Sequence, residues 1–318
     1  APSWGAGILL LTLAARGSPV ASKFGKQVIS LKEPQSGRRV NLVGTMHYNP
    51  ASILKTQRVI KELADSDELS SVVIEMCPKR WGSMEKSQPR GSPRRKLLDN
   101  EMQAAADLAK DNQVEIILGD RCIASILDRA GALFKKTGTD LLSPLEGWPA
   151  IARDFGAFLK SKSGTATPKI GLLDFTDPLL IMGLPVSLMR YPLALFLKMP
   201  LRLLGLLGTL ELLSADIVVN GGDPAVAGGM DAFAAISAAL LFGQFLFTIA
   251  LARTIVVVML MERDEVLADA IRDACRKMDR DQEVVAVLGI AHCNGVARLL
   301  AEQPSTSTDA AASSTTRA

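Results

Sequence analysis

The chain of 318 residues has only two histidines, His47 and His292, and aromatic residues make up 5% of it. So few aromatic side chains disfavour a surface that stacks nucleic-acid bases. Basic residues are dense only in residues 89–96, inside a stretch of proline, glycine and serine, and the net charge is +3. This pattern is typical of a solvated loop. We therefore predict no nucleic-acid partner.

Several common catalytic signatures are also missing. The sequence has no phosphate-binding P-loop, no dinucleotide-binding glycine fingerprint and no Gly-x-Ser-x-Gly elbow. Its four cysteines include no Cys-x-x-Cys pair, and a disulfide framework is not indicated at this length. We interpret the four cysteines as reduced thiols.

Both ends of the chain differ in composition from the rest. No acidic residue precedes Glu33. An acid-free, lightly basic segment with alanine and serine is typical of the remnant of a transit or signal peptide. We interpret residues 1–36 as such a leader, which favours a plastid or mitochondrial location. Residues 304–318 are of low complexity and are predicted to form a disordered tail.

Short apolar runs alternate with helical patterns in two parts of the chain. Strands are predicted over 40–45, 71–77, 114–121 and 283–292. Helices are predicted over 51–64, 97–112, 123–134 and 256–278. This alternation predicts an α/β fold with a mainly parallel sheet flanked by helices. The α/β domain is predicted to consist of residues 37–140 and 255–303.

Residues 141–254 are predicted to form a hydrophobic helical insertion in this domain. Residues 232–252 carry no charge and are long enough to cross a bilayer. Residues 178–213 are apolar but contain prolines and basic residues, which suits a segment at a membrane interface. A buried helical subdomain is the alternative for both. If the two histidines share one site, the insertion crosses a membrane an even number of times.

Both histidines stand in the same Gly-x-x-His frame after an apolar run, in "VGTMH" (43–47) and "LGIAH" (288–292). The carboxyl ends of parallel strands meet at one edge of a sheet, where such folds build their sites. We therefore expect His47 and His292 to lie together at this edge. Glu75 and the pair Asp120 and Arg121 also follow predicted strands.

Two imidazoles and a carboxylate are suitable ligands for a divalent metal such as Zn²⁺, Mn²⁺ or Co²⁺. His47, His292 and Glu75 would leave a position for a water that the metal activates to attack a carbonyl. The candidates for a second, general-base carboxylate are Glu101 and Glu262. The candidates for holding a substrate carboxylate or an oxyanion are Arg80, Arg121 and Arg263.

Other interpretations of these residues stay open. Both histidines could be polar plugs at strand ends, and Glu75 could form a structural ion pair with Arg80 or Arg121. Cys77 beside either histidine would be a nucleophile. Cys293 is adjacent to His292, but successive strand residues point to opposite faces, so that pair would not easily work together.

These motifs together resemble the TraB/PrgY/GumN family, which includes the Tiki membrane-associated metalloproteases and is akin to the erythromycin-esterase-like proteins. Five blocks agree in order and residue type over about 40–135 and 256–300. They are "GTMHYNPAS" with Ser52, "VVIEMCPKR" with Glu75 and Arg80, "EMQAA…ILGDR…ILDR" with Glu101, Asp120, Arg121 and Arg129, "MERDEVLADAI" with Glu262, Arg263 and Asp264, and "GIAHCNG" with Gly295.

The resemblance implies an α/β sheet with a helical insertion and, for the Tiki branch, metal-dependent peptide cleavage. We therefore expect a membrane-associated, metal-dependent hydrolase or peptidase. The alternative is a non-catalytic membrane-associated regulator that binds a peptide or small ligand in the same cleft. A membrane tether would depend on residues 178–252 alone. The sequence predicts no oligomeric state.

Overall fold

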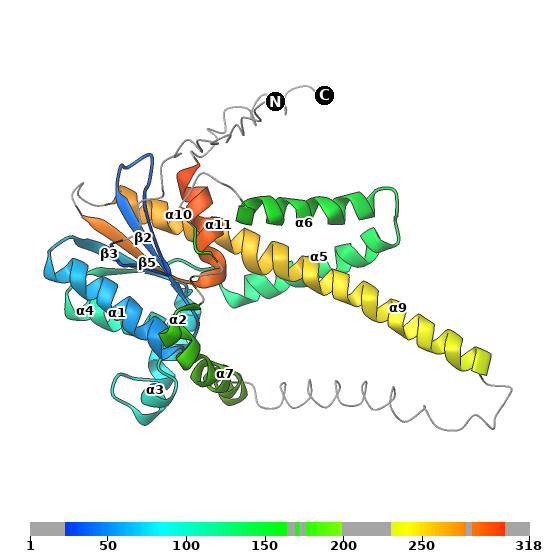
Figure 1. Cartoon of the computed structure of the whole chain (residues 1–318), viewed down its shortest axis with the longest axis horizontal. Helices are drawn as coiled ribbons and strands as arrows, with labels where there is room; N and C mark the ends of the chain where they lie inside the picture. The colour runs from blue at the N-terminus through cyan, green and yellow to red at the C-terminus, as the bar shows by residue number, and fades with distance from the viewer. Residues whose placement is uncertain are drawn as a thin grey trace, which may run out of the picture.

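The computed structural model describes residues 23–163, 169–171, 174, 176–198, 230–277 and 282–302. Five strands form one sheet in the order β1-β2-β5-β3-β4 (Figure 1). The strands are β1 (Val28–Lys32), β2 (Arg39–Thr45), β3 (Leu69–Ile74), β4 (Glu115–Leu118) and β5 (Glu283–Gly289). β1 is antiparallel to β2, and all other pairs are parallel. The predicted α/β fold, with a mainly parallel sheet flanked by helices, is confirmed.

The last strand in the sequence, β5, lies in the centre of the sheet. Val43 of β2 pairs with Val287, and Val73 of β3 pairs with Ala286. All seven residues of β5 are buried, as expected for a short apolar strand that is covered on both faces. The chain thus leaves the sheet after β4 and returns to its middle, which places segments far apart in the sequence side by side.

One face of the sheet is covered by α1 (Pro50–Asp65) and α4 (Glu101–Asp111) (Figure 1). Asn49 caps α1 through its side chain, which accepts a hydrogen bond from the Ala51 N–H, and Pro50 suits the first helical position. The apolar stripe predicted for this helix is buried against the sheet. It comprises Ile53, Val59, Ile60 and Leu63.

The opposite face is covered by α10 (Glu262–Arg276) and α11 (Ile290–Ala301). Alternate residues of β5 face the two layers, since side chains along a strand point in turn to opposite faces. Val285 and Val287 pack in the cluster with α1 and α4, whereas Val284, Ala286 and Leu288 pack with α10 and α11. The sheet therefore forms the central layer of an α/β/α arrangement.

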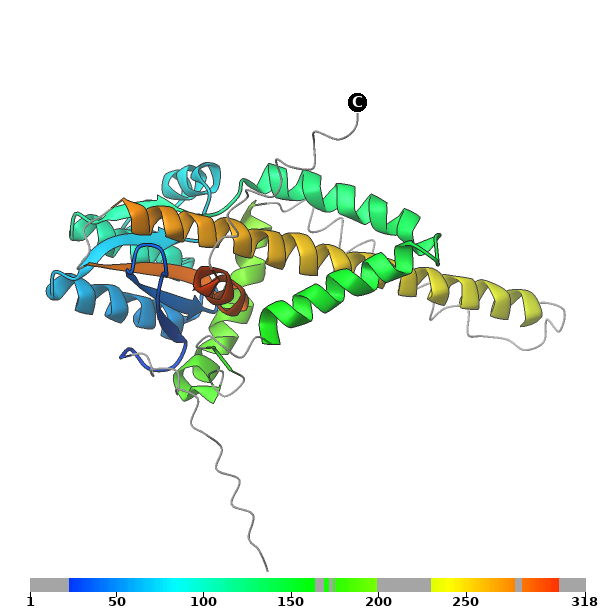
Figure 2. The same cartoon turned by 90° about the horizontal axis from the view of Figure 1, so that it is seen from above.

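The insertion forms an arm of helices beside the sheet (Figures 1 and 2). The arm consists of α6 (Gly147–Ser163) and α9 (Met230–Thr254) together with α5 (Ile123–Leu141), which precedes the predicted insertion. α7 (Pro178–Lys198) lies apart from the arm, where its Leu180 carbonyl accepts from the side chain of Asn49 at the start of α1. α9 continues through a π-helical segment, η2 (Ile255–Met261), into α10. Arg253 is 3% exposed and forms ion pairs with Asp140 of α5 and Asp154 of α6. This buried pairing ties the three helices together.

Large apolar side chains remain exposed on the two apolar helices of the insertion. They include Met182, Leu188 and Met189 on α7 and Leu241, Phe242, Phe245 and Phe247 on α9. Among the described residues, one helical stretch, Leu241–Arg276, is long and apolar enough to cross a membrane by length and composition. Only 22% of its most apolar window is buried in the molecule.

Some boundaries differ from those predicted. The last strand ends at Gly289 rather than at residue 292, because Gly289 caps α11 and His292 lies in the first turn of that helix. The predicted helix over 97–112 is interrupted, because the Asn100 side chain accepts from the Gln103 N–H and starts α4 at Glu101. β1 lies inside the range 1–36 that we interpret as a leader. Residues 1–22 and the tail 304–318 lie outside the described residues.

Two of the four basic residues in 89–96 form ion pairs within the protein. Arg90 forms an ion pair with Asp111, and Arg95 forms one with Asp107. The segment includes α3 (Pro93–Leu97) and follows α2 (Pro78–Ser87). These ion pairs reduce the positive charge that this segment presents to solvent.

We expect Gly44→Val in β2 to destabilise the protein by about 1–3 kcal/mol, because a side chain there overpacks the core. A Cβ atom at Gly44 would lie 2.7 Å from Ile170 Cδ1 and 3.1 Å from Cys293 Sγ. Urea unfolding measures the change. The control is Gly82→Ala in α2, where a Cβ meets no atom within 4 Å. An equal stability of the two variants would contradict the packing analysis.

Candidate functional site

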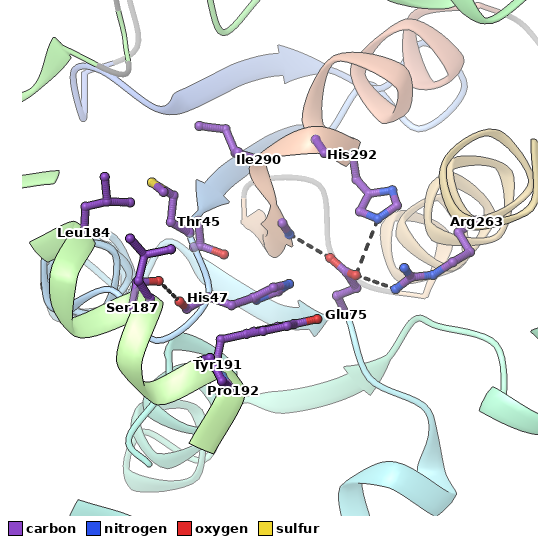
Figure 3. Close-up of a pocket in the computed structure, with 14 residues that line it drawn as sticks. Thr45, His47, Glu75, Leu184, Ser187, Tyr191, Pro192, Arg263, Ile290 and His292 are labelled. Atoms are coloured by element: carbon purple, nitrogen blue, oxygen red, sulfur yellow. Dashed lines mark hydrogen bonds and ion pairs between the residues drawn. The ribbon is translucent and has the colours of Figure 1, made fainter. Parts of the chain in front are cut away.

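A cavity of about 430 Å³ lies at the carboxyl ends of β2, β3 and β5 (Figure 3). It is lined by Thr45, Met46, His47, Glu75, Leu184, Ser187, Leu188, Tyr191, Pro192, Arg263, Gly289, Ile290, Ala291 and His292. Both histidines thus reach the same edge of the sheet. This confirms the expectation drawn from the paired Gly-x-x-His frames, because β2 and β5 are neighbours.

His47 is delivered by a tight turn between β2 and α1. The Met46 N–H donates to Ser52 Oγ at 2.9 Å, and Tyr48 has a φ of +62°. Left-handed backbone is uncommon for a residue other than glycine and is often found at functional sites. The Tyr48 N–H donates to Glu101 Oε2 at 3.2 Å, which fixes the turn to the first residue of α4.

Glu101 also orients the imidazole of His47. The His47 Nδ1 lies 2.5 Å from Glu101 Oε1, and the side chain of His47 is 42% exposed whereas that of Glu101 is 1% exposed. If Nδ1 donates to the carboxylate, Nε2 carries the lone pair and faces the cavity. Burial disfavours the imidazolium, but the hydrogen bond and charge of Glu101 outweigh it and raise the pKa of His47 above 6.5.

His292 has the same kind of partner. Its Nδ1 lies 2.6 Å from Asp264 Oδ1 in α10, and its Nε2 lies 3.5 Å from Glu75 Oε1. Both rings therefore have a carboxylate behind Nδ1 and turn Nε2 toward the cavity and Glu75 (Figure 3). A carboxylate behind an imidazole fixes the tautomer and the orientation of the ring.

Glu75 joins three elements at the bottom of the cavity. It follows β3 directly, its Oε2 accepts from the Gly289 N–H at 2.7 Å, and its Oε1 forms an ion pair with Arg263. Burial raises the pKa of Glu75, but His292, Arg263, His47 and the Gly289 N–H together lower it below 4.5. Glu75 is therefore a carboxylate anion over the physiological range.

Arg263 is shared between two buried carboxylates. Besides Glu75, it contacts Asp120 through Nε, 3.0 Å from Oδ1, and Nη2, 2.8 Å from Oδ2. Arg80 approaches the same Asp120 Oδ2 at 3.0 Å. Burial lowers the pKa of Arg263, but Glu75 and Asp120 raise it by more than burial lowers it. The guanidinium therefore stays charged. This network closes the carboxyl ends of β3 and β4 against α10.

The two glycines of the histidine frames have different roles. A Cβ atom at Gly289 would lie 3.2 Å from Glu75 Oε2 and 3.4 Å from His47 Nε2. Gly289 therefore leaves space for the functional groups themselves. A Cβ at Gly44 would instead meet the side chains of Ile170, Cys293 and Ile290. Gly44 is needed for packing beneath α11.

The structure separates the predicted site residues into two groups. His47, Glu75, His292 and Arg263 line the cavity, and Glu101 lies directly behind His47. The others lie outside the cavity lining. Glu262 pairs with Arg121 at 3.6 Å and Arg129 at 2.8 Å, and Arg80 pairs with Asp120.

Sequence reasoning did not include Asp264 or the wall formed by α7 among the site residues. Asp264 directly follows Arg263, and its burial is what identifies it. No sequence signal indicated that α7 forms a wall of the cavity, because the number of residues between α7 and the histidines does not determine where the helix packs. Ser187 of α7 donates a hydrogen bond to the His47 carbonyl, and Tyr191 packs edge-on against Tyr48 with centroids 6.2 Å apart.

The predicted metal ligands do not fit a metal ion in this arrangement. Both Glu75 oxygens are engaged, one by Arg263 and one by the Gly289 N–H. The guanidinium already supplies the positive charge that a cation would bring. Within the described ranges, no group of three or more His, Cys, Asp or Glu side chains is arranged to hold a metal. A divalent metal stays a prediction from the residue types alone, and the arrangement of the side chains does not support it.

The cysteine alternative gains no geometric support. Cys77 is buried at the start of α2, and Cys293 packs with its Sγ 3.8 Å from the Gly289 carbonyl oxygen. Neither is among the residues that line the cavity.

No known family model matches this chain, and a comparison with curated proteins finds no match either. The resemblance to the TraB/PrgY/GumN family therefore stays a prediction from the motifs.

We expect Arg263→Ala to lower the free energy of unfolding by about 3–5 kcal/mol near neutral pH, because it leaves buried carboxylates without their cation. The stability that comes from the lowered pKa of Glu75 is fully present above pH 4.5, the ordinary pKa of a glutamate. It is lost as the pH falls through the lower pKa that Glu75 has in the folded protein. The difference from the wild type therefore shrinks in acid. Urea unfolding over a pH series measures it.

The matched control is Arg276→Ala on the same helix, where the ion pair with Asp273 is exposed on both sides. Exposed pairs contribute about 0–1 kcal/mol. A loss in Arg263→Ala as small as in this control would contradict the role of the buried network.

Proposed function

We propose that this protein is a hydrolase that cleaves an ester or amide bond, with His47 as the general base. The observation that carries the proposal is the position of His47. Its Nδ1 is held by Glu101 at 2.5 Å, while its Nε2 faces the cavity beside Glu75. A general base works best when its pKa lies near the operating pH, as that of an imidazole does, and Glu101 raises the pKa of His47.

In the proposed reaction, Nε2 of His47 takes a proton from a water as that water attacks the substrate carbonyl. The imidazolium that forms is stabilised by Glu101, which orients the ring and does not touch the substrate. The same proton then passes from Nε2 to the leaving oxygen or nitrogen. Glu75 is a weak base because its pKa is lowered, and its negative charge instead supports the imidazolium of His47.

The oxyanion of the tetrahedral intermediate would lie near the N-terminus of α11, which is beside His47 Nε2 and Glu75. α11 begins after its N-cap residue Gly289, whose N–H donates to Glu75 Oε2. Its first residues, Ile290 and Ala291, line the cavity. The N-terminus of a helix favours negative charge, and preorganised N–H groups at a forming oxyanion are a large term in catalysis.

The remaining walls favour a substrate with an apolar group next to the reacting carbonyl. Leu184, Leu188, Tyr191 and Pro192 form one side of the cavity. The part of α7 outside the cavity continues this apolar surface through Met182 and Met189. Peptides with apolar side chains and small acyl esters both meet this requirement.

Membrane association is part of the proposal. The exposed apolar side chains of α7 and α9 form more apolar surface than single scattered residues would. β2 and β5 pair in one sheet, so both histidines lie on the same side of any membrane. The charge of Arg253 is buried and paired with Asp140 and Asp154, so it does not face lipid. The part of α9 that precedes Arg253 is the part that would contact lipid. A location in a plastid or mitochondrion stays a prediction from the N-terminal composition.

We expect the purified chain to hydrolyse p-nitrophenyl butyrate or members of a fluorogenic peptide library, and His47→Gln to lose at least about 100-fold in kcat/KM. Glu101→Gln should lower kcat and move the acid limb of the pH–rate profile to lower pH, because Glu101 raises the pKa of the base. Lys61→Gln, on the exposed side of α1, is the control and should leave the rate unchanged.

The acid limb should lie above pH 6.5 in the wild type, since the base acts only when it is deprotonated. NMR titration of the His47 imidazole measures this pKa without a substrate. Turnover that a chelator abolishes and Zn²⁺ or Mn²⁺ restores would replace this mechanism with the metal-dependent one. Peptide binding without turnover in any condition would favour the non-catalytic regulator.

We expect the full chain to float with phosphatidylcholine vesicles in a density gradient, and the triple variant Phe242→Asn, Phe245→Asn, Phe247→Asn to lose most of this binding. The three side chains are 56–62% exposed, and their removal takes away apolar area that lipid would bury. Leu54→Asn removes one equally exposed apolar side chain from α1 and is the control. Unchanged flotation of the triple variant would contradict the role of α9.

A further inference from the structure

Two of the four thiols lie at the same edge of the sheet, beside the network of Arg263. Cys77 comes two residues after Glu75, and Cys122 comes two residues after Asp120. Each cysteine thus follows, at the same spacing in the sequence, one of the two carboxylates that Arg263 joins. The sequence contains no Cys-x-x-Cys motif, so only the sheet brings these thiols together.

The strand pairing explains the proximity. β3 and β4 are parallel neighbours with Ile74 paired to Leu118. Backbone bonds continue past the last pair, from the Gly119 N–H to the Ile74 oxygen at 3.0 Å and from the Asp120 N–H to the Met76 oxygen at 3.2 Å. Neighbouring strands lie about 4.8 Å apart, which is within the Cα separation that a disulfide spans.

The side chains then meet at the start of α2. Cys77 is the N-cap residue of this helix, and the neighbouring Cys77 side chain raises the pKa of the Cys122 thiol. Cys77 is buried, and Cys122 is exposed. When an exposed thiol lies beside a buried one, a reagent can reach the exposed thiol and the buried thiol can then resolve the mixed disulfide.

We propose that Cys77 and Cys122 form a reversible redox modification site that is oxidised by a low-molecular-weight disulfide such as glutathione disulfide. The Cys122 thiolate attacks one sulfur of the reagent, forms a mixed disulfide and releases one glutathione thiol. The Cys77 thiolate attacks the Cys122 sulfur and releases the second. Two protein thiols become one disulfide, and the two glutathione leaving groups take up the two protons.

The consequence is a covalent link between the segments that carry Glu75 and Asp120. In the reduced protein these segments are joined through Arg263 and the backbone bonds between β3 and β4. A disulfide here closes a loop that contains α2, α3, α4 and β4. Closing such a loop restricts the unfolded chain, so the oxidised protein should be the more stable form. This inference does not depend on the proposed hydrolase activity.

The test uses the full reduced chain, equilibrated with defined ratios of reduced and oxidised glutathione and then quenched with acid. Trypsin places Cys77 in residues 62–79 and Cys122 in residues 122–129. We expect mass spectrometry to find these two peptides joined, and the cross-link to disappear in Cys122→Ser. Cys275→Ser, which removes a buried thiol elsewhere, is the control and should keep it.

The oxidised form should also melt roughly 5–10 °C higher than the reduced form, and this shift should be absent in Cys122→Ser. Because Cys122 is exposed, its replacement by serine should not prevent folding, whereas Cys77→Ser removes a buried group. Glutathione attached to Cys122 with Cys77 free at equilibrium would overturn the proposal. So would a Cys122 thiol that stays unmodified in oxidised glutathione.

Discussion

The buried carboxylate of Glu75 is the group on which the rest of the site depends. A charge taken out of water costs several kcal/mol unless partners replace its hydration. Here the partners are Arg263 from α10, the Gly289 N–H at the end of β5 and His292 from α11. None of them is close to Glu75 in the sequence, so the charge is satisfied only when the central strand, the helix before it and the helix after it are all in place.

The two histidines also depend on buried charged partners from other segments of the chain. Each imidazole is held through Nδ1 by a buried carboxylate, Glu101 for His47 and Asp264 for His292. The left-handed conformation of Tyr48 is the local cost of presenting His47, and it is maintained by the bond from its N–H to Glu101. The insertion completes the enclosure, because Ser187 of α7 binds the His47 carbonyl. A segment that looked separable from the sheet therefore forms part of the cavity.

Much of the fold could be predicted from local patterns. Each apolar run that precedes a predicted site residue is a strand, and the amphipathic run over 51–64 is α1 with its stripe buried. Strand ends place His47 and Glu75 at the cavity, where the positions of the apolar runs predicted them. Positions on helices were harder to predict, since Glu262 and Arg263 are adjacent in the sequence but only Arg263 lines the cavity. The rotation of a helix about its axis is set by packing, which motifs do not record.

The sequence by itself determined the alternation of strands and helices, the positions of the two Gly-x-x-His frames and the apolar character of the insertion. These features depend on local hydrophobic period and on single residue types. Only the tertiary structure decided that β5 lies between β2 and β3, that Asp264 rather than Glu262 supports a histidine, and that α7 forms a wall of the cavity. Those outcomes depend on contacts between distant segments, where burial of charge and close packing select one arrangement from many.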